Sequence, residues 1–518
     1  MRYFIPSWYV SEDFWKNGDV PFHHTSNQTD FDDMISLMSM HMKNNEDFQM
    51  IILNYSPQLR LFLHRYNLFE SEYFSLFDYL QNANHQLPKA INFLDLDWPK
   101  HTEFVYSPFM VEAIIDKDTY SLISFNQEGY ILYIDEFQYG EQIQRMFFDD
   151  RGFISSILKY RSNSPYKQFY LTTSGDVVLV ENLITGKVNV TEKLNEKLQR
   201  FNYPSMKDVI NELICNFNHS HITENDDILV AADERHNQII INNFLKNQIC
   251  FSIFSQRNNH ISHKLIDTLL SAKSCIVDTL KLESKINELI SKRDKKVKIK
   301  RITPFDAEKI SNNSFQLNET YIGFWTSGLS EEEIDLTIDY IYEYIKTKEN
   351  FKLIILTKNI LSNTPQWLLN KVKKKNISYN EENNSMSTEM TDILNEEINF
   401  TELIKIEPII SEIDLLKIVS KMRAIIDLSD EPDLYLQISC ISSGVPQINK
   451  VPTDYVTPNI NGIIINDFNK IPSSLDFFID SLKHWNYSYA YSIKLIDLYS
   501  SSEIIKQLNY LIKGDYYD

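Results

Sequence analysis

The stretch from Ile425 to Asp467 decides the fold of this chain: IIDLSDEPDLYLQISCISSGVPQINKVPTDYVTPNINGIIIND. It begins as a strand that leads into a loop and a helix, and the sequence GVPQI, residues 444–448, follows the helix. The pair Asn461-Gly462 stands directly before another strand. Alternation of strands and helices at this spacing predicts an α/β domain.

This frame resembles the donor-sugar motif of retaining two-domain (GT-B) glycosyltransferases, E-G-F-G-x-x-x-x-E-A-M-A-x-G-x-P-V-I followed by an N-G pair. Glu431 takes the position of the first glutamate but precedes Pro432 instead of glycine, and Ser439 replaces the second glutamate. The resemblance implies that the remaining frame is retained architecture, and that Glu431 is the residue most suited to binding a ligand. The frame residues are Gly444, Pro446, Gln447, Ile448, Asn461 and Gly462.

A basic pair that such an enzyme needs is missing. Active sites of this class use R-x4-K near the start of the second domain, because the leaving nucleoside diphosphate carries charge that must be neutralised. Aligning residues 327–333, SGLSEEE, puts Gly328 on the arginine and Glu333 on the lysine, and aligning Gly323-Phe324-Trp325 puts Phe324 on the arginine. The sequence therefore predicts a degenerate glycosyltransferase without catalytic residues.

Composition excludes several function classes. The chain has 518 residues, enough for about three domains, and 43% of them are hydrophobic, as in a globular protein. Its net charge of −20 disfavours nucleic acid as a partner, because phosphate backbones would be repelled. Only 11 glycines are present, and neither G-x-G-x-x-G nor a P-loop occurs, so we expect no nucleotide cofactor.

Cysteine usage and the N-terminus predict a cytoplasmic protein. No signal peptide or membrane-spanning apolar run is recognisable. The cysteines form no C-x-x-C pair, which suits a reducing compartment; they are Cys215, Cys250, Cys275 and Cys440.

Changes of periodicity divide the chain. Residues 1–102 and 196–300 predict the two parts of a first Rossmann-like domain, separated at 103–195 by an antiparallel β-sheet domain with hairpin signals such as NQEG and DDRG. The basic run SKRDKKVKIKR, residues 291–301, is typical of a solvated linker, with a binding patch as the alternative. A second Rossmann-like domain is expected at 301–490, including a polar insertion at 376–395, and a C-terminal helix at 491–518 that crosses back to the first domain. The expected fold class is thus α/β and GT-B-like, with two Rossmann-like domains facing a cleft.

Two further segments carry a more specific resemblance. YFIPSWY at residues 3–9 and LNYSPQLR at 53–60, together with ISSGVPQIN at 441–449, are similar to the first of the accessory secretory proteins of the accessory Sec system. Membership implies a non-catalytic scaffold in the export of glycosylated serine-rich repeat adhesins. The implied partners are two other accessory Sec proteins, the accessory Sec motor ATPase, the serine-rich preprotein and glycans that contain N-acetylglucosamine. It also implies a cytoplasmic location that becomes peripheral at the membrane through these partners.

Other motifs have plainer interpretations. Asp95-Leu96-Asp97 matches a D-x-D metal site but is expected to be a loop, and His219, His221, His260 and His263 lack further ligands at metal-site spacing. Residues 233–236, DERH, follow a strand and either line the interdomain cleft or form a charged loop. Two alternatives to the scaffold remain: a carbohydrate-binding module that recognises the glycosylated preprotein, and a divergent active retaining glycosyltransferase.

Overall fold

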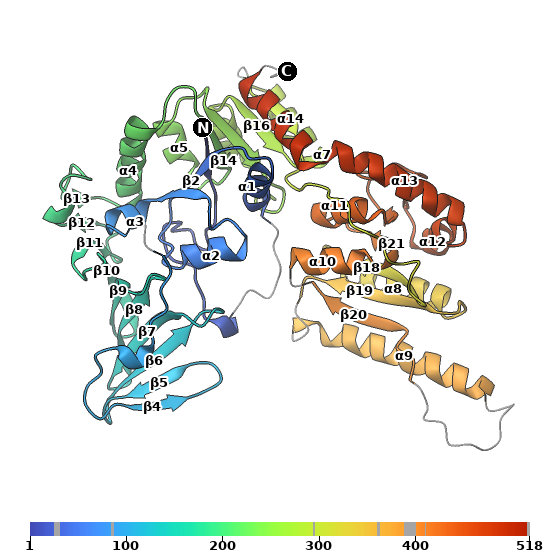
Figure 1. Ribbon diagram of the computed structural model, residues 1–518, viewed down its shortest axis with the longest axis horizontal. Coiled ribbons are helices and arrows are strands. Elements are labelled where there is room, and N and C mark those ends of the chain that lie inside the picture. The colour runs from blue at the N-terminus through green and yellow to red at the C-terminus, as the bar shows by residue number, and fades with distance from the viewer. Residues whose placement is uncertain are drawn as a thin grey trace. The chain divides into compact units, whose positions relative to one another are not determined.

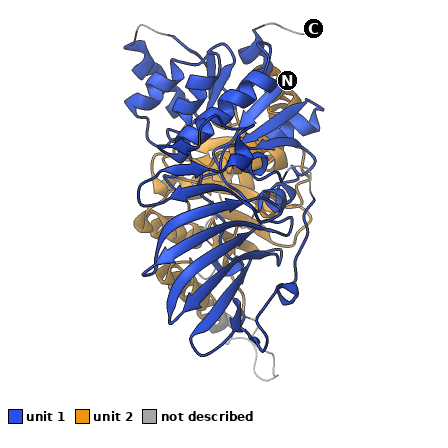
Figure 2. Ribbon diagram, turned by 90° about the vertical axis from the view of Figure 1, so that its left-hand side faces the viewer, with its two compact units in different colours: residues 1–25, 37–302, 508–518 blue, residues 26–36, 303–507 orange. Residues whose placement is uncertain are grey.

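The computed structural model describes residues 1–24, 32–83, 87–293, 296–359, 363–387, 400–409 and 411–514. The chain forms two compact units, shown separately coloured in Figure 2. Unit 1 contains residues 1–25, 37–302 and 508–518, and unit 2 contains residues 26–36 and 303–507.

Unit 1 is built on a parallel sheet with the strand order β17-β16-β15-β14-β1-β2-β3. Figure 1 labels β2, β14 and β16 of this sheet. The inner strands β14, β15 and β16 are rich in apolar residues and buried throughout, as expected where helices cover both faces of a sheet. The strands are β1 (Arg2–Ile5), β2 (Phe48–Ile52), β3 (Glu72–Ser75), β14 (Asp227–Ala231), β15 (Ile249–Ile253), β16 (Ser274–Val277) and β17 (Lys298–Arg301). The helices are α1 (Asp33–Lys43), whose residues 33–36 fall in unit 2, α2 (Leu59–Arg65), α3 (Leu76–Leu80), α4 (Met206–His221), α5 (Asn237–Asn243), α6 (His263–Leu269) and α7 (Leu280–Ser291).

An antiparallel meander is inserted between α3 and α4, and it pairs in sequence order from β4 to β13. Its turns fall at the glycine-containing signals, where Gly129, Gly152, Gly175 and Gly186 have positive φ. One face of the sheet packs Ile123, Ile134 and Phe148 against residues 91–98. The strands are β4 (Glu103–Tyr106), β5 (Val111–Ile114), β6 (Thr119–Phe125), β7 (Ile131–Gln138), β8 (Glu141–Phe148), β9 (Ile154–Arg161), β10 (Ser164–Leu171), β11 (Val177–Asn182), β12 (Val188–Val190) and β13 (Asn202–Tyr203).

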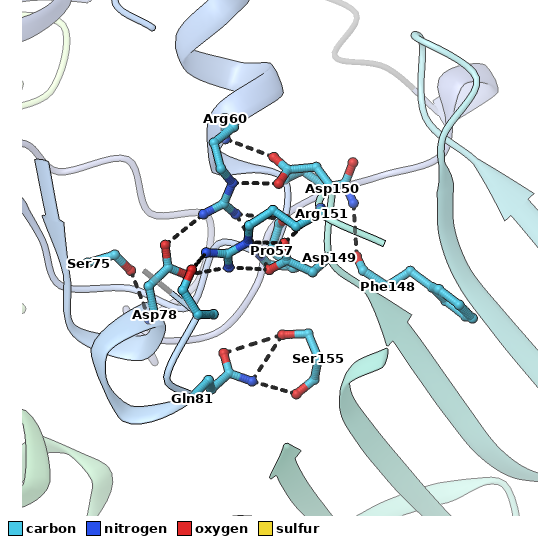
Figure 3. A network of polar contacts seen from close by, with 12 residues as sticks. Pro57, Arg60, Ser75, Asp78, Gln81, Phe148, Asp149, Asp150, Arg151 and Ser155 are labelled. Carbon is cyan, nitrogen blue, oxygen red and sulfur yellow. Dashed lines mark hydrogen bonds and ion pairs between the residues drawn. The ribbon is translucent and has the colours of Figure 1, made fainter. Parts of the chain in front are cut away.

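A buried charge cluster joins the meander to the parallel sheet (Figure 3). Arg60, on α2, binds Asp78 at 2.6 Å and Asp150 at 2.5 Å, and Arg151 binds Asp78 at 2.8 Å and Asp149 at 2.6 Å. Only 2% of the Arg60 side chain is exposed. Because ions this deeply buried require partners, the cluster fixes the two sheets of unit 1 to one another.

The segments YFIPSWY and LNYSPQLR have defined structural roles within unit 1. Tyr55 donates a hydrogen bond to Ser156, and Gln58 donates to the carbonyl oxygen of Phe148. LNYSPQLR therefore binds the parallel-sheet part of unit 1 to the meander. YFIPSWY includes Tyr3 to Ile5 of β1 and continues past the carboxyl end of this strand, where the Ser7 hydroxyl donates to Asp233. Both segments are therefore tied to residues far away in the sequence.

Unit 2 contains a second parallel sheet with the order β20-β19-β18-β21-β22-β23. This order confirms the predicted α/β fold class for the second half of the chain. The strands are β18 (Thr320–Trp325), β19 (Phe351–Thr357), β20 (Ile404–Pro408), β21 (Met422–Asp427), β22 (Gln447–Asn449) and β23 (Gly462–Ile464). The helices are α8 (Glu331–Ile345), α9 (Gln366–Ser387), α10 (Glu412–Val419), α11 (Leu434–Ser443), α12 (Ile471–Ile479), α13 (Leu482–Leu498) and α14 (Ser501–Lys513).

Helix α14 begins in unit 2, but its residues from Leu508 onward belong to unit 1. There Asn509 accepts a hydrogen bond from Arg2 of β1 at 2.8 Å, and Leu508, Leu511 and Ile512 are buried. The end of the chain is thus part of the N-terminal unit.

The basic run at 291–301 is not simply a linker. Helix α7 extends to Ser291, and Lys298–Arg301 forms β17, which pairs in parallel with β16. Charged residues are tolerated here because β17 lies at the edge of the sheet, where lysines are common. The linker interpretation was therefore wrong for residues 298–301.

The polar insertion predicted at 376–395 begins too early. Helix α9 continues to Ser387, and residues 388–395 lie outside the described residues. Asn376 is buried and its side chain accepts hydrogen bonds from the backbone N–H groups of Leu403 and Ile404 at the start of β20. The polar composition of this segment suggested an insertion, but the segment continues helix α9 and its Asn376 is buried.

Removing the central arginine should destabilise unit 1 strongly. Arg60→Leu leaves Asp78 and Asp150 without this cation in a buried site, so we expect the free energy of unfolding to fall by about 3–5 kcal/mol. Arg65→Leu is the matched control on the same helix, because Arg65 is exposed and its ion pair is with Glu128. It should cost less than about 1 kcal/mol. Denaturant titration measures both, and equal costs would contradict the role given to the cluster.

Candidate functional site

The sequence predicted a site around the glycosyltransferase-like frame, and all of its residues lie in unit 2. Strand β21 is followed by a loop, α11, β22 and β23, and both β22 and β23 join the sheet in parallel. Asp427 is the last residue of β21, and Asn449 the last of β22. The carboxyl ends of parallel strands are where open α/β sheets bind ligands.

Gly444 ends α11 in the left-handed conformation, with φ +67°. A Cβ atom at this position would lie 2.2 Å from Cδ2 of Tyr489, which belongs to α13. The glycine is therefore required twice, by the helix cap and by the close approach of the Tyr489 ring. Pro446, two residues on, is buried and its carbonyl oxygen accepts from Ile425 of β21.

The remaining frame residues fix the register of β22 and β23. Gln447 pairs opposite Gly462, where a Cβ atom would lie 2.5 Å from the Gln447 carbonyl oxygen. Asn461 is buried; it donates to the Tyr455 carbonyl oxygen at 2.8 Å and accepts from the Thr457 N–H at 2.7 Å. These residues bind their own chain, and the structure accounts for them as architecture.

The two positions of the glutamate pair differ completely. The Ser439 side chain is buried within α11, where it donates to the Tyr435 carbonyl oxygen at 2.7 Å. Glu431 lies exposed in the loop between β21 and α11. The Ser439 hydroxyl is therefore buried, and its proton is used in a hydrogen bond within α11.

The residues that the sequence alignment sets on the basic clamp are Gly328 and Glu333. Gly328 has φ +81°, and a Cβ atom there would lie 3.1 Å from Cβ of Ser429. Glu333 closes the capping box of α8 with Ser330, and the Ser330 backbone N–H and Lys450 hold its pKa below the ordinary value. Lys450 lies 3.4 Å from Glu333 and 2.9 Å from Asp430. This cation, which follows β22 in the sequence, is thus paired with two acids.

A second ion pair lies in the loop after β21 and was not predicted from the sequence. Lys358 and Asp433 are each 7% exposed and lie 2.9 Å apart, and Asp433 also caps the N-terminus of α11. Asp427 accepts from the backbone N–H groups of Ser429 and Asp433, and burial raises its pKa to about 7. Lysine and aspartate so far apart in sequence give no local signal of pairing.

The other candidate residues form no ligand site of their own. Among the described residues, no group of three or more His, Cys, Asp or Glu side chains could hold a metal ion, so neither Asp95 with Asp97 nor the histidines are brought together in this way. His219 interacts through Nδ1 with the Cys215 carbonyl oxygen of its own helix, and His263 is the first residue of α6. In unit 1, Asp233 is bound by Arg235 and Ser7, and these hydrogen bonds hold its pKa well below the ordinary value although burial opposes them. The segment 233–236 is a charged loop tied to β1.

Two parallel-sheet units, the first with an inserted antiparallel meander, define a glycosyltransferase-like GT-B fold. The pneumococcal O-GlcNAc transferase GtfA, solved with UDP and GlcNAc, has the same fold: its TM-score is 0.70 at 13% identity, covering 100% of this chain and 99% of its own. The chain belongs to the family of accessory Sec system protein 1, whose model matches residues 1–514. It thus has a place in the accessory Sec system.

Relatives agree over almost the whole length. The accessory Sec system protein 1 of Staphylococcus aureus is 38% identical over 517 residues, covering 99% of each chain. A chain of the Glycosylation Associate Protein (Gap123) complex from Streptococcus agalactiae has a TM-score of 0.82 at 28% identity, covering 99% of this chain and all of its own. A chain from the structure of accessory secretory proteins 1, 2 and 3 of Streptococcus pneumoniae has a TM-score of 0.80 at 26% identity, covering 99% of both.

Within the described ranges, no helix is both long enough and apolar enough to span a bilayer.

Adding a methyl group at Gly444 should destabilise unit 2. Gly444→Ala combines a left-handed backbone with a collision against Tyr489, so we expect a loss of roughly 3 kcal/mol or more. Gly140→Ala is the control, since Gly140 has φ +77° but nothing within 4 Å of the added carbon. It should cost only about 1 kcal/mol. Urea denaturation of both variants and of Gly444→Ala/Tyr489→Ala measures the collision, and an additive double variant would argue against it.

Asp427 should make the stability of unit 2 depend on pH. Its folded pKa of about 7 lies above the ordinary value, so its contribution is fully present below about pH 4 and is lost as the pH rises through 7. Asp427→Asn removes this titration. We expect the stability difference between variant and wild type to shift by at least about 1 kcal/mol in favour of the variant from pH 5 to pH 8. Chemical denaturation at the two pH values tests this, and parallel pH profiles would refute it.

Proposed function

We propose that this chain is a non-catalytic scaffold of the accessory Sec system, which binds two other accessory Sec proteins and assists the export of glycosylated serine-rich adhesins. The observation that carries the proposal is the charge at the clamp position. Glu333 stands where a diphosphate-binding lysine would be needed, and the nearby Lys450 pairs with Glu333 and Asp430. A leaving nucleoside diphosphate would meet negative charge here, which raises the barrier to transfer.

The frame around the clamp supports the same conclusion. A catalytic or ligand-binding site needs polar groups that are free to act on a substrate. Here Ser439, Gln447 and Asn461 are buried and bonded to their own backbone. These side chains stabilise the domain, because their polar atoms form hydrogen bonds with backbone groups of the same chain.

The relatives support a role in an assembly. Two similar chains were solved in complexes, Gap123 and accessory secretory proteins 1, 2 and 3. For this chain we infer the corresponding complex with two other accessory Sec proteins. Cooperation with the motor ATPase, contact with the serine-rich preprotein and recognition of its N-acetylglucosamine-containing glycans stay predictions of the family resemblance, as does peripheral location at the membrane.

Co-expression with the two other accessory Sec proteins of the same host tests the scaffold. We expect the three chains to elute together in size-exclusion chromatography, with a mass by light scattering that requires all of them. The same preparation, incubated with UDP-GlcNAc and a serine-rich acceptor, should release no UDP above a buffer control. Elution of this chain alone would contradict the scaffold. Sugar transfer that Glu431→Gln abolishes would show instead that the chain is a divergent glycosyltransferase.

A further inference from the structure

Arg423 occupies an irregular position in the second parallel sheet. Along β21, Met422 pairs with Tyr321 of β18, and Ala424 pairs with the next residue, Ile322, so Arg423 has no partner in the register. Such an extra residue is a β-bulge, which redirects a side chain out of the normal alternation of the strand. Bulges are frequent beside functional sites, which makes the direction of Arg423 worth explaining.

Two elements of unit 2, helix α13 and the loop before β18, form hydrogen bonds with the bulge. Trp485 of α13 donates its indole N–H to the Arg423 carbonyl oxygen at 3.1 Å, satisfying a backbone group that the bulge removes from the ladder. The side chain of Asn312 donates to the Met422 carbonyl oxygen at 3.3 Å, and the backbone of Asn313 donates to Ser420. The loop that carries Phe315 is therefore fastened to the start of β21.

An aromatic stack surrounds the Arg423 guanidinium. Its Cζ atom lies 3.4 Å from the centre of the Phe315 ring and 5.4 Å from that of Trp485. Phe315 meets Trp485 edge to face at 4.4 Å, and Trp485 stacks on Tyr489 at 5.6 Å. The rings attract the guanidinium by cation–π interaction, but they accept no hydrogen bond from the N–H groups in the plane of the guanidinium.

Within the described ranges, no carboxylate pairs with the Arg423 guanidinium. Burial lowers the pKa of Arg423 to about 10, with no opposing contribution from a carboxylate. Its Nη1 atom is buried without a hydrogen-bond partner in the part of the chain that the structure describes. By contrast, Arg60, Arg145, Arg151 and Arg235 are each bound to aspartate. An unpaired and partly desolvated cation is costly, and here it stands in a chain with a net charge of −20.

We propose that Arg423 and Phe315 form a docking site for a partner protein, in which an aspartate or glutamate side chain of the partner pairs with the Arg423 guanidinium while its apolar surface covers Phe315. This inference rests on the proposed function, because the partner is one of the two accessory Sec proteins with which the chain assembles. Charge complementarity selects the acid, since a carboxylate supplies the planar pair of acceptors that guanidinium binds best.

The apolar part of the site favours a protein surface. Phe315 is 46% exposed and Leu317, two residues further along the same loop, is 38% exposed. An exposed aromatic ring beside an unpaired arginine has the composition of an interface hot spot, where arginine and aromatic residues contribute most of the binding energy. Trp485 and Tyr489 behind them keep the site rigid, which reduces the entropy lost on binding.

Affinity measurements on the full-length chain test the site. The probe is the copurified pair of other accessory Sec proteins, titrated by isothermal calorimetry into wild type and variants. Arg423→Gln should weaken binding by about 30-fold or more, and Phe315→Ala by about 5-fold or more. Lys421→Gln removes an exposed charge two residues from Arg423 and should change the affinity by less than about 3-fold.

Stability separates a docking residue from a structural one. Because no acid among the described residues pairs with Arg423, Arg423→Gln should leave the melting temperature of the isolated protein unchanged or raised. A clear fall in melting temperature with unchanged affinity would overturn the inference. If wild type and Arg423→Gln bind the pair equally, the docking site is wrong while the scaffold stands. If wild type does not bind the pair, the proposed function itself fails.

A last arm decides between a protein and a glycan. Wild type is titrated with N-acetylneuraminic acid, which offers a carboxylate on a sugar ring. No binding is expected, because a sugar of this size cannot both pair with Arg423 and cover the exposed loop. Binding that Arg423→Gln abolishes would assign the site to an acidic glycan and overturn the protein partner.

Discussion

The pairing of Arg60 and Arg151 with Asp78, Asp149 and Asp150 is the interaction on which unit 1 depends. Each side chain is buried, and each ion is acceptable there only because the others are present. Arg60 comes from a helix of the α/β part, whereas Asp149, Asp150 and Arg151 come from the hairpin between β8 and β9. The meander is consequently joined to the parallel sheet through buried residues. Its orientation on that sheet is set by ion pairs as well as by apolar packing.

Unit 2 depends on close approach instead of charge. Gly444 lets Tyr489 of α13 reach the end of α11, and Gly462 lets β23 reach the backbone of Gln447. A side chain at either position would push these elements apart by collisions at 2.5 Å or less. Close packing within unit 2 therefore explains why Gly444 and Gly462 are glycines, without reference to a bound sugar.

Charges in unit 2 fall into two kinds with different consequences. Lys450 pairs with both Glu333 and Asp430, which leaves this group with net negative charge, whereas Lys358 and Asp433 form a balanced pair. Arg423 has no such neutralising partner among the described residues. The proposed docking site therefore rests on Arg423, and not on the charges that are paired within the chain.

The sequence by itself determined the fold class and much of the order of elements, because buried parallel strands, hairpin signals and the G-x-P and N-G positions are local patterns that survive in any tertiary setting. It also predicted that Ser439 and Glu333 stand where a glycosyltransferase has a glutamate and a lysine. It misassigned residues 298–301 and Asn376, since edge strands and buried asparagines look like linkers and insertions until their partners are known. Only the tertiary structure decided what the LNYSPQLR segment binds, that Lys450 is neutralised and that Arg423 is not, because pairing between charges depends on distances across the fold that no local pattern records.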